Sequence, residues 1–327
     1  MKHGHTLLIG AALIVLSMKP FPGGNRGIGF DDLHFAPALR KVMVPGGGTG
    51  RLALIDPDSQ KVEIIGGFSV QAGYSGGHGE GITSADAGAG LIYVTDRSAR
   101  LAEIVDPGTR KVIGRARPAS EPDYVRFVPQ TNELWVTEPR AERIEIFALS
   151  NRRIPVLIRS GSIAVRGGPE SLIIGHRQAF THLWRGITLV IDLRRRQIIH
   201  RWANGCRGSR GIALDERRGF LFAGCDEGQL SVLELNSGKA LGETSAGSGV
   251  DIIAYNQDLA HVYLPGASSG TLAIVGISSA GSPTVLQTIN TVKGAHCASA
   301  DDRGRVYVCD PDDGRILVFK DSLPRGK

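Results

Sequence analysis

The 327-residue sequence lacks several features that define common protein classes. It has no long segment whose apolar residues recur with the helical period of 3.6, which argues against a helix bundle. It contains no HExxH or phosphate-loop motif and no GxSxG followed by the helix that a nucleophile elbow requires, so these signatures of catalysis and nucleotide binding are missing. The glycine-rich GGGTG at Gly46 lies in an expected hairpin turn with no helix after it. With 42% hydrophobic and 21% charged residues, the composition is that of an ordinary globular protein.

Cysteine is also scarce. The chain has four, with neither CxxC nor CxxCH, which excludes c-type haem attachment and makes a zinc site unfavourable. The stretch HCASADDRGRVYVC is typical of a hairpin that places Cys297 opposite Cys309, and a disulfide between them is predicted. Cys206 and Cys225 stand at the two ends of an equivalent hairpin, with an offset register, and form the second predicted pair. The alternative is four buried thiols.

The chain has one apolar run of note near its start, Leu7 to Leu16, which follows Lys2 and is too short to span a bilayer. It resembles a secretory signal cleaved after Ser17, so we expect residues 1–17 to be a signal peptide and 18–29 a linker. An uncleaved amphipathic start or a wrongly assigned start codon is the alternative. The signal predicts a periplasmic or secreted protein with no membrane span in the mature chain.

Positive charge is in moderate excess and is spread along the chain. The formal net charge is +6 and the isoelectric point is near 9.3. The densest basic run, LRRRQ at Leu193 to Gln197, falls where a strand is expected to turn over. No recognition helix or aromatic platform accompanies the charge, so a nucleic-acid partner is not expected.

Glycine, by contrast, is abundant, with 44 residues, and points to many short strands joined by tight turns. One apolar phrase recurs seven times, and its starts are separated by 49, 43, 44, 42, 42 and 44 residues. This period is typical of a four-stranded propeller blade. The copies are LALIDP from Leu52, LAEIVDP from Leu101, IEIFAL from Ile144, TLVIDL from Thr188, LSVLEL from Leu230, LAIVGI from Leu272 and ILVFKD from Ile316.

A second alternating strand precedes each copy, and a further short strand is expected upstream of it. The second strands include LIYVTD, ELWVTE and RVYVCD, from Leu91, Glu133 and Arg305. Because one blade cannot bury both of its faces alone, the blades must stack radially and close into a ring. The sequence therefore predicts an all-β fold, a single seven-bladed β-propeller over residues 30–327.

These second-strand phrases, each followed by a turn and then an I-x-V-x-D pattern, resemble the YVTN repeats of YncE-like seven-bladed propellers, a WD40-like architecture. The resemblance covers about residues 30–321. It implies an exported bacterial protein of binding or undetermined function.

Ring closure is the weakest point of the pattern. After ILVFKD only SLPRGK remains, which is too short for an outermost strand. The last blade is expected either to lack that strand or to borrow it from residues before Asp31, which would join the two ends of the chain.

The first strand of each blade lines the central channel of a propeller, so the residues just before these strands are candidate binding groups. All seven are ionisable, and five of them are acidic. Such a ring must be hydrated, partly protonated or neutralised, because like charges a few ångström apart repel. The seven are Asp31, Glu80, Asp123, Glu170, Arg210, Asp251 and His296, and His78 is a further candidate.

Two functions remain open. The first, which we favour, is a non-enzymatic exported binding protein that acts as a monomer and holds a small molecule or a protein partner at the channel mouth. No cofactor is predicted, although oxygen ligands would suit a divalent cation, calcium or magnesium. The second is a lactonase-type hydrolase, with Glu80 or Glu170 and His296 as general base or metal ligand and Arg210 stabilising an oxyanion. A merely hydrated channel is the third reading of the same residues.

Overall fold

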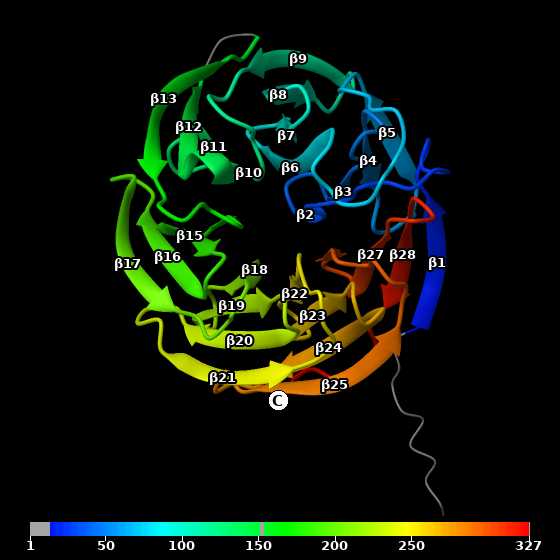
Figure 1. Ribbon diagram of the computed structural model, residues 1–327, viewed down its shortest axis with the longest axis vertical. Helices are drawn as coiled ribbons and strands as arrows, with labels where there is room; N and C mark the ends of the chain where they lie inside the picture. Colours follow the sequence, from blue (N-terminus) through cyan, green and yellow to red (C-terminus); the bar gives the residue numbers. More distant parts are fainter. Residues whose placement is uncertain (1–13, 151–153, 327) are drawn as a thin grey trace, which may run out of the picture.

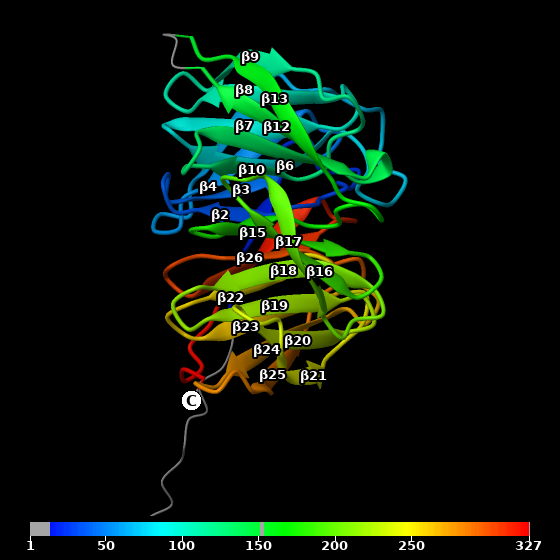
Figure 2. The same cartoon turned by 90° about the vertical axis from the view of Figure 1, so that its left-hand side faces the viewer.

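The computed structural model describes residues 14–150 and 154–326, which form 28 strands. These strands make seven four-stranded antiparallel sheets arranged as blades around a central axis (Figure 1). Figure 2 shows the ring from the side, with the strands of neighbouring blades stacked on one another. Among the described residues the only helix is one 3₁₀ turn, η1 (Pro139–Ala141). The predicted all-β seven-bladed propeller is confirmed.

Each blade runs from an inner to an outer strand. The first blade consists of β2 (His34–Ala36), β3 (Lys41–Pro45), β4 (Arg51–Ile55) and β5 (Val62–Gly66). The second consists of β6 (Ile82–Gly88), β7 (Leu91–Asp96), β8 (Leu101–Asp106) and β9 (Lys111–Ala116). The third consists of β10 (Val125–Val128), β11 (Glu133–Glu138), β12 (Arg143–Leu149) and β13 (Leu157–Ala164).

The next three blades repeat this order. The fourth blade consists of β14 (Ile173–Ile174), β15 (Gln178–Leu183), β16 (Ile187–Asp192) and β17 (Gln197–Ala203). The fifth consists of β18 (Ser209–Asp215), β19 (Phe220–Cys225), β20 (Gln229–Glu234) and β21 (Ala240–Ser245). The sixth consists of β22 (Ala254–Asn256), β23 (His261–Gly266), β24 (Thr271–Ile277) and β25 (Pro283–Asn290).

The recurring phrases are the two middle strands of the blades, which are buried on both faces. An aromatic side chain at the centre of the second strand packs between neighbouring blades. Tyr93, Trp135, Tyr263 and Tyr307 occupy this place and are fully buried. The outer strands have one face in water and therefore alternate, as in β25, where half-buried and exposed residues follow one another in turn. This difference explains why the middle strands give the clear signal in the sequence.

The seventh blade closes the ring with both ends of the chain. Its first three strands are β26 (Ala298–Ala300), β27 (Arg305–Asp310) and β28 (Arg315–Lys320), and its outermost strand is β1 (Ile14–Pro20). β1 runs antiparallel to β28 on the outer rim (Figure 1). The expectation that the last blade borrows a strand from residues before Asp31 is confirmed.

The position of β1 bears on the expected signal peptide. Residues 1–13 of that segment lie outside the described residues, and cleavage after Ser17 falls inside β1. A chain cut there keeps Met18–Pro20 of the strand, and the cleavage itself stays a prediction. No helix in the described part of the chain has the length and apolar character that a membrane crossing requires.

The two predicted disulfides have different outcomes. Cys206 and Cys225 are bonded, with their sulfur atoms 1.98 Å apart, as predicted. Cys297 and Cys309 lie opposite one another, next to the Ala298–Val308 pair, in the predicted register. Both of these thiols are nevertheless free and buried. The Cys309 sulfur accepts a hydrogen bond from the Cys297 amide (3.2 Å) and lies 3.8 Å from Nδ1 of His296.

Candidate functional site

A polar cavity of about 280 Å³ lies where the loops before the inner strands meet around the axis. Five of the seven residues predicted as a charged ring line it, together with His78. They are Asp31, Asp123, Glu170, Arg210 and Asp251. The geometry thus brings together side chains that are up to 220 positions apart in sequence, although it does not by itself assign them a ligand.

Glu80 is one of the two ring residues that the structure places outside this cavity. Its side chain is exposed and lines a neighbouring glycine-rich cavity. The cause is Gly81, whose φ of +70° reverses the chain just before β6. A Cβ at this position would collide with the carbonyl oxygen of Gly47, so only glycine fits. The reversal turns Glu80 outward, and His78 faces the axis in its place.

His296 borders an adjoining cavity, which it shares with His78, Arg210 and Asp251. The rings of His78 and His296 are stacked with their centroids 5.1 Å apart. Donor atoms of His78, Asp251 and His296 lie within 4.8 Å of one another. Two of these three donors are nitrogens, and calcium and magnesium take oxygen ligands, so this set does not suit either ion.

The inner-strand pattern missed the cations that neutralise the site. Arg97 forms an ion pair with Asp123, and Arg140 forms one with Glu121 (3.2 Å). Arg97 follows β7 directly, and Arg140 lies in η1 just after β11. In the second and third blades, the residue directly after the second strand therefore also reaches the mouth. Aligning that column in the sequence would have found Arg97.

Arg210, which the sequence did predict for the ring, forms an ion pair with Glu170. Its guanidinium also lies over the ring of Trp184, 3.7 Å from the centroid, which holds the side chain in one orientation. Trp184 directly follows β15, the second strand of its blade, and so belongs to the same column as Arg97.

His78 links two carboxylates across the cavity. Its Nδ1 lies 3.1 Å from Asp31 and its Nε2 lies 3.5 Å from Asp251. The charge of Asp31 raises the pKa of His78 to about 9, so the imidazole is protonated at neutral pH. Burial opposes the ionisation of Asp31, but His78, with Arg97, more than offsets it and lowers the pKa of this carboxyl.

Two other carboxyl groups of the site are shifted in the opposite direction. Burial raises the pKa of Asp123 to about 7. The nearby Arg97 lowers this pKa and the negative charge of Asp31 raises it further, so the net shift is upward. Burial likewise raises the pKa of Glu170, against the effect of Arg210. These two carboxylates are costly to keep charged at the mouth, which is typical of groups placed to meet a ligand.

The far side of the channel has a different character. A cavity of about 370 Å³ there is lined mainly by apolar residues of the inner strands. Tyr124 borders both this cavity and the polar one. At its edge, the buried Arg126 binds Asp32 (2.6 Å). The two carboxyl groups with a raised pKa, Asp123 and Glu170, line the polar cavity and not this one.

Comparison with known proteins supports the propeller fold and assigns no chemistry to the site. No protein-family model matches the sequence, and no curated protein does. Among solved structures, a chain in the crystal structure of the mitotic checkpoint complex has a TM-score of 0.77 at 12% identity, covering 98% of this chain and 95% of that one. A chain of hydrazine synthase from Kuenenia stuttgartiensis has a TM-score of 0.71 at 10% identity, covering 98% and 100%. At these identities the likeness shows the propeller fold alone.

Proposed function

We propose that this protein is an exported, non-enzymatic binding propeller that holds a small polar ligand carrying both positive and negative charge at the channel mouth. The observation that carries the proposal is the alternation of carboxyl groups with Arg97, Arg210 and His78 around a cavity of about 280 Å³. A cavity of that size is at the lower end for small-molecule sites. The resemblance of its strand phrases to exported YVTN-repeat propellers supports the same class of function.

The pairing of charges favours a zwitterion over a bare divalent cation. The cations already present form ion pairs with four of the carboxylates, so a metal ion would have to displace a guanidinium or an imidazolium. A ligand with both charges can instead place its anionic group near Arg97 or Arg210 and its cationic group near Asp123 or Glu170, the partners of these arginines. Both ends then exchange water for charged partners, and no charge is left unpaired in the cavity.

The test is calorimetric titration of the purified protein with free amino acids, betaines, sugars, lactones and calcium or magnesium salts. We expect a zwitterion to bind, and the double change Asp123→Asn and Glu170→Gln to weaken it at least about tenfold, the cost of one lost charge pair. The melting temperature of this variant should be unchanged or higher, because both carboxyls are costly to ionise.

Glu80→Gln is the matched control, since this acidic residue belongs to the same sequence column but lies outside the cavity. It should bind the ligand as the wild type does. Binding that survives the double change, or that is lost in the Glu80 variant, contradicts the proposed site. Hydrolysis of a lactone in the same panel would favour the hydrolase alternative.

A further inference from the structure

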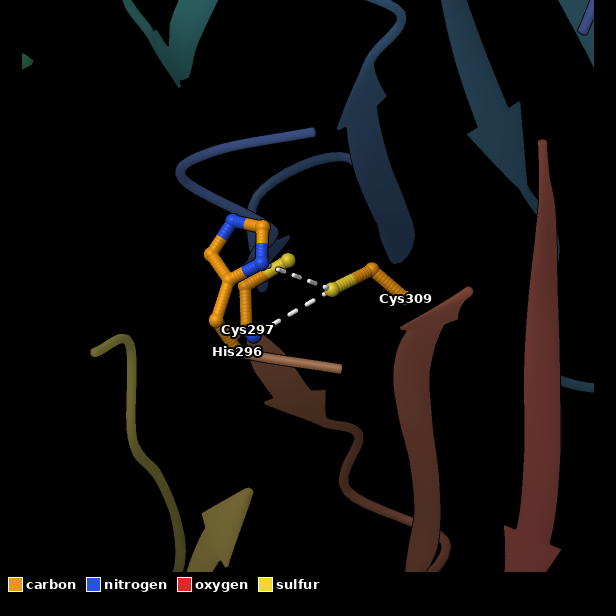
Figure 3. Close-up of side chains that lie close together, drawn as sticks. All are labelled: His296, Cys297 and Cys309. Atoms are coloured by element: carbon orange, nitrogen blue, oxygen red, sulfur yellow. Dashed lines mark hydrogen bonds between the residues drawn. The ribbon is translucent and has the colours of Figure 1, made fainter. Parts of the chain in front are cut away.

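Behind the polar mouth, His296 belongs to a second cluster that the binding function does not use. Its side chain lies beside the free thiols of Cys297 and Cys309, at the end of the β26–β27 hairpin (Figure 3). Both cysteines are 0% exposed and belong to the apolar core around Phe30 and Tyr307. A free cysteine often packs in a core as a small apolar residue, but two thiols beside an imidazole also bring three metal-ligand groups together.

The donor atoms have the spacing of ligands to one ion. One nitrogen of His296 and the sulfur atoms of Cys297 and Cys309 all lie within 4.8 Å of one another. The Cys309 sulfur is 3.8 Å from Nδ1 of His296. With metal–sulfur and metal–nitrogen bonds of about 2.3 and 2.0 Å, a trigonal site requires about 3.7 Å between these two atoms.

The second nitrogen of His296 is fixed as in known metal sites. Its Nε2–H donates to the carbonyl oxygen of Phe30 (2.8 Å), which keeps Nδ1 on the side of the sulfur atoms. A histidine that binds a metal through one nitrogen commonly donates the other to a backbone carbonyl, and this bond sets its tautomer and orientation. The Nδ1–H donates to Gly294 (2.7 Å) and would be given up on binding.

We propose that His296, Cys297 and Cys309 bind one thiophilic cation, copper(I), through Nδ1 and the two sulfur atoms. Soft thiolate ligands select copper(I) or zinc, and a structural zinc site needs four protein ligands. Within the described residues this cluster contains three histidine, cysteine or carboxylate ligands, a number that suits three-coordinate copper(I). The protons on the thiols and on Nδ1 leave to solvent, and no electron is transferred. This inference goes beyond the proposed ligand site and does not depend on it.

The test is transfer of copper(I) from its coloured bicinchoninate complex to the protein without oxygen. A Cys206→Ser, Cys225→Ser chain serves as the parent, so that the two remaining thiols are those of the cluster. We expect one equivalent of copper(I) per chain, and about 100-fold weaker binding, or none, after Cys309→Ser. Zinc(II) is titrated in a parallel arm. Uptake of one zinc ion in preference to copper(I) overturns the assignment of the metal.

A second measurement uses the wild-type chain and needs no variant to fold. Alkylation of Cys297 and Cys309 is followed over time by mass spectrometry in urea below the unfolding midpoint, where transient opening lets the buried thiols react, with and without copper(I), and we expect the metal to slow the reaction of both thiols. Equal alkylation in the two samples overturns the proposal. So does a chain whose Cys297–Cys309 pair is isolated as a disulfide and, once reduced, takes up no metal.

Discussion

His182 is fully buried in β15, where its Nδ1 lies 3.0 Å from the hydroxyl of Thr188. Burial lowers the pKa of His182 to about 4, well below the value near 6.5 of an unfolded chain. As pH falls, the unfolded chain therefore takes up this proton before the folded chain does. The contribution of neutral His182 to stability is complete above about pH 6.5 and is lost progressively toward pH 4.

We predict that wild-type protein loses roughly 3 kcal/mol of unfolding free energy through this residue between about pH 6.5 and 4. His182→Gln should lose less over the same interval, because glutamine does not titrate. Denaturant unfolding at a series of pH values measures the difference. His176→Gln, at an exposed histidine of the same blade, should keep the wild-type slope. Equal slopes in the wild type and His182→Gln would contradict the assignment.

Single residues of the polar mouth could be predicted only in part. Asp31 and Asp251 were found because their position is set by the start of an inner strand, which the repeat locates. Glu80 was misplaced because a positive φ at Gly81 redirects a side chain without any change in the apolar pattern. Arg97 was missed because it follows the second strand of the hairpin, whose end lies beside the start of the inner strand, and only the inner-strand starts were aligned.

Among the elements, the hairpin of β18 and β19 carries the one disulfide of the described residues. Cys206 lies in the connection after β17 and is bonded to Cys225 at the end of β19, across a separation of 19 residues. The bond fixes the entry to the inner strand at a β-bulge between Ser209 and Ile212. Unlike hydrogen bonds of the ladder, it also restricts the unfolded chain.

Replacing both Cys206 and Cys225 by serine should lower the unfolding free energy by about 2–4 kcal/mol, the usual effect of opening a loop of this size. Denaturant titration measures it. Dithiothreitol should destabilise the wild type by a similar amount and leave the double variant unchanged. A double variant as stable as the oxidised wild type would show that the bond does not support the blade.

The elements themselves could be predicted well, because the middle strands repeat. The seven second and seven third strands lie at the recurring phrases, since strands buried on both faces keep the same apolar pattern. The same register reasoning placed Cys297 opposite Cys309. It could not decide their state, because the direction of the Cys309 side chain depends on His296 and on the amide of Cys297.

The whole ring depends on one pair of strands. Met18 pairs with Leu317 and Pro20 with Arg315, so β1 is held to the last blade along most of its length. His296 adds a second connection between the same regions through its hydrogen bond to Phe30. The seventh blade is therefore complete only when both ends of the chain are in place.

We predict a graded loss of thermal stability as β1 is shortened. A chain that starts at Met18 keeps part of the strand, whereas one that starts at Phe21 lacks it and should melt roughly 5–10 °C lower than the full chain. Scanning calorimetry compares the three. Met18→Thr changes an exposed side chain and keeps the backbone pairing, so it should melt as the wild type does. The same melting temperature for all lengths would contradict a role of β1 in closure.

This closure also has a consequence for biosynthesis. Of the described strands, β1 is translated first and its partner β28 last. The first six blades can therefore form in order while β1 stays unpaired until β28 is available. During that interval the incomplete molecule exposes edges that other chains could pair with, which is a natural point for a chaperone to act.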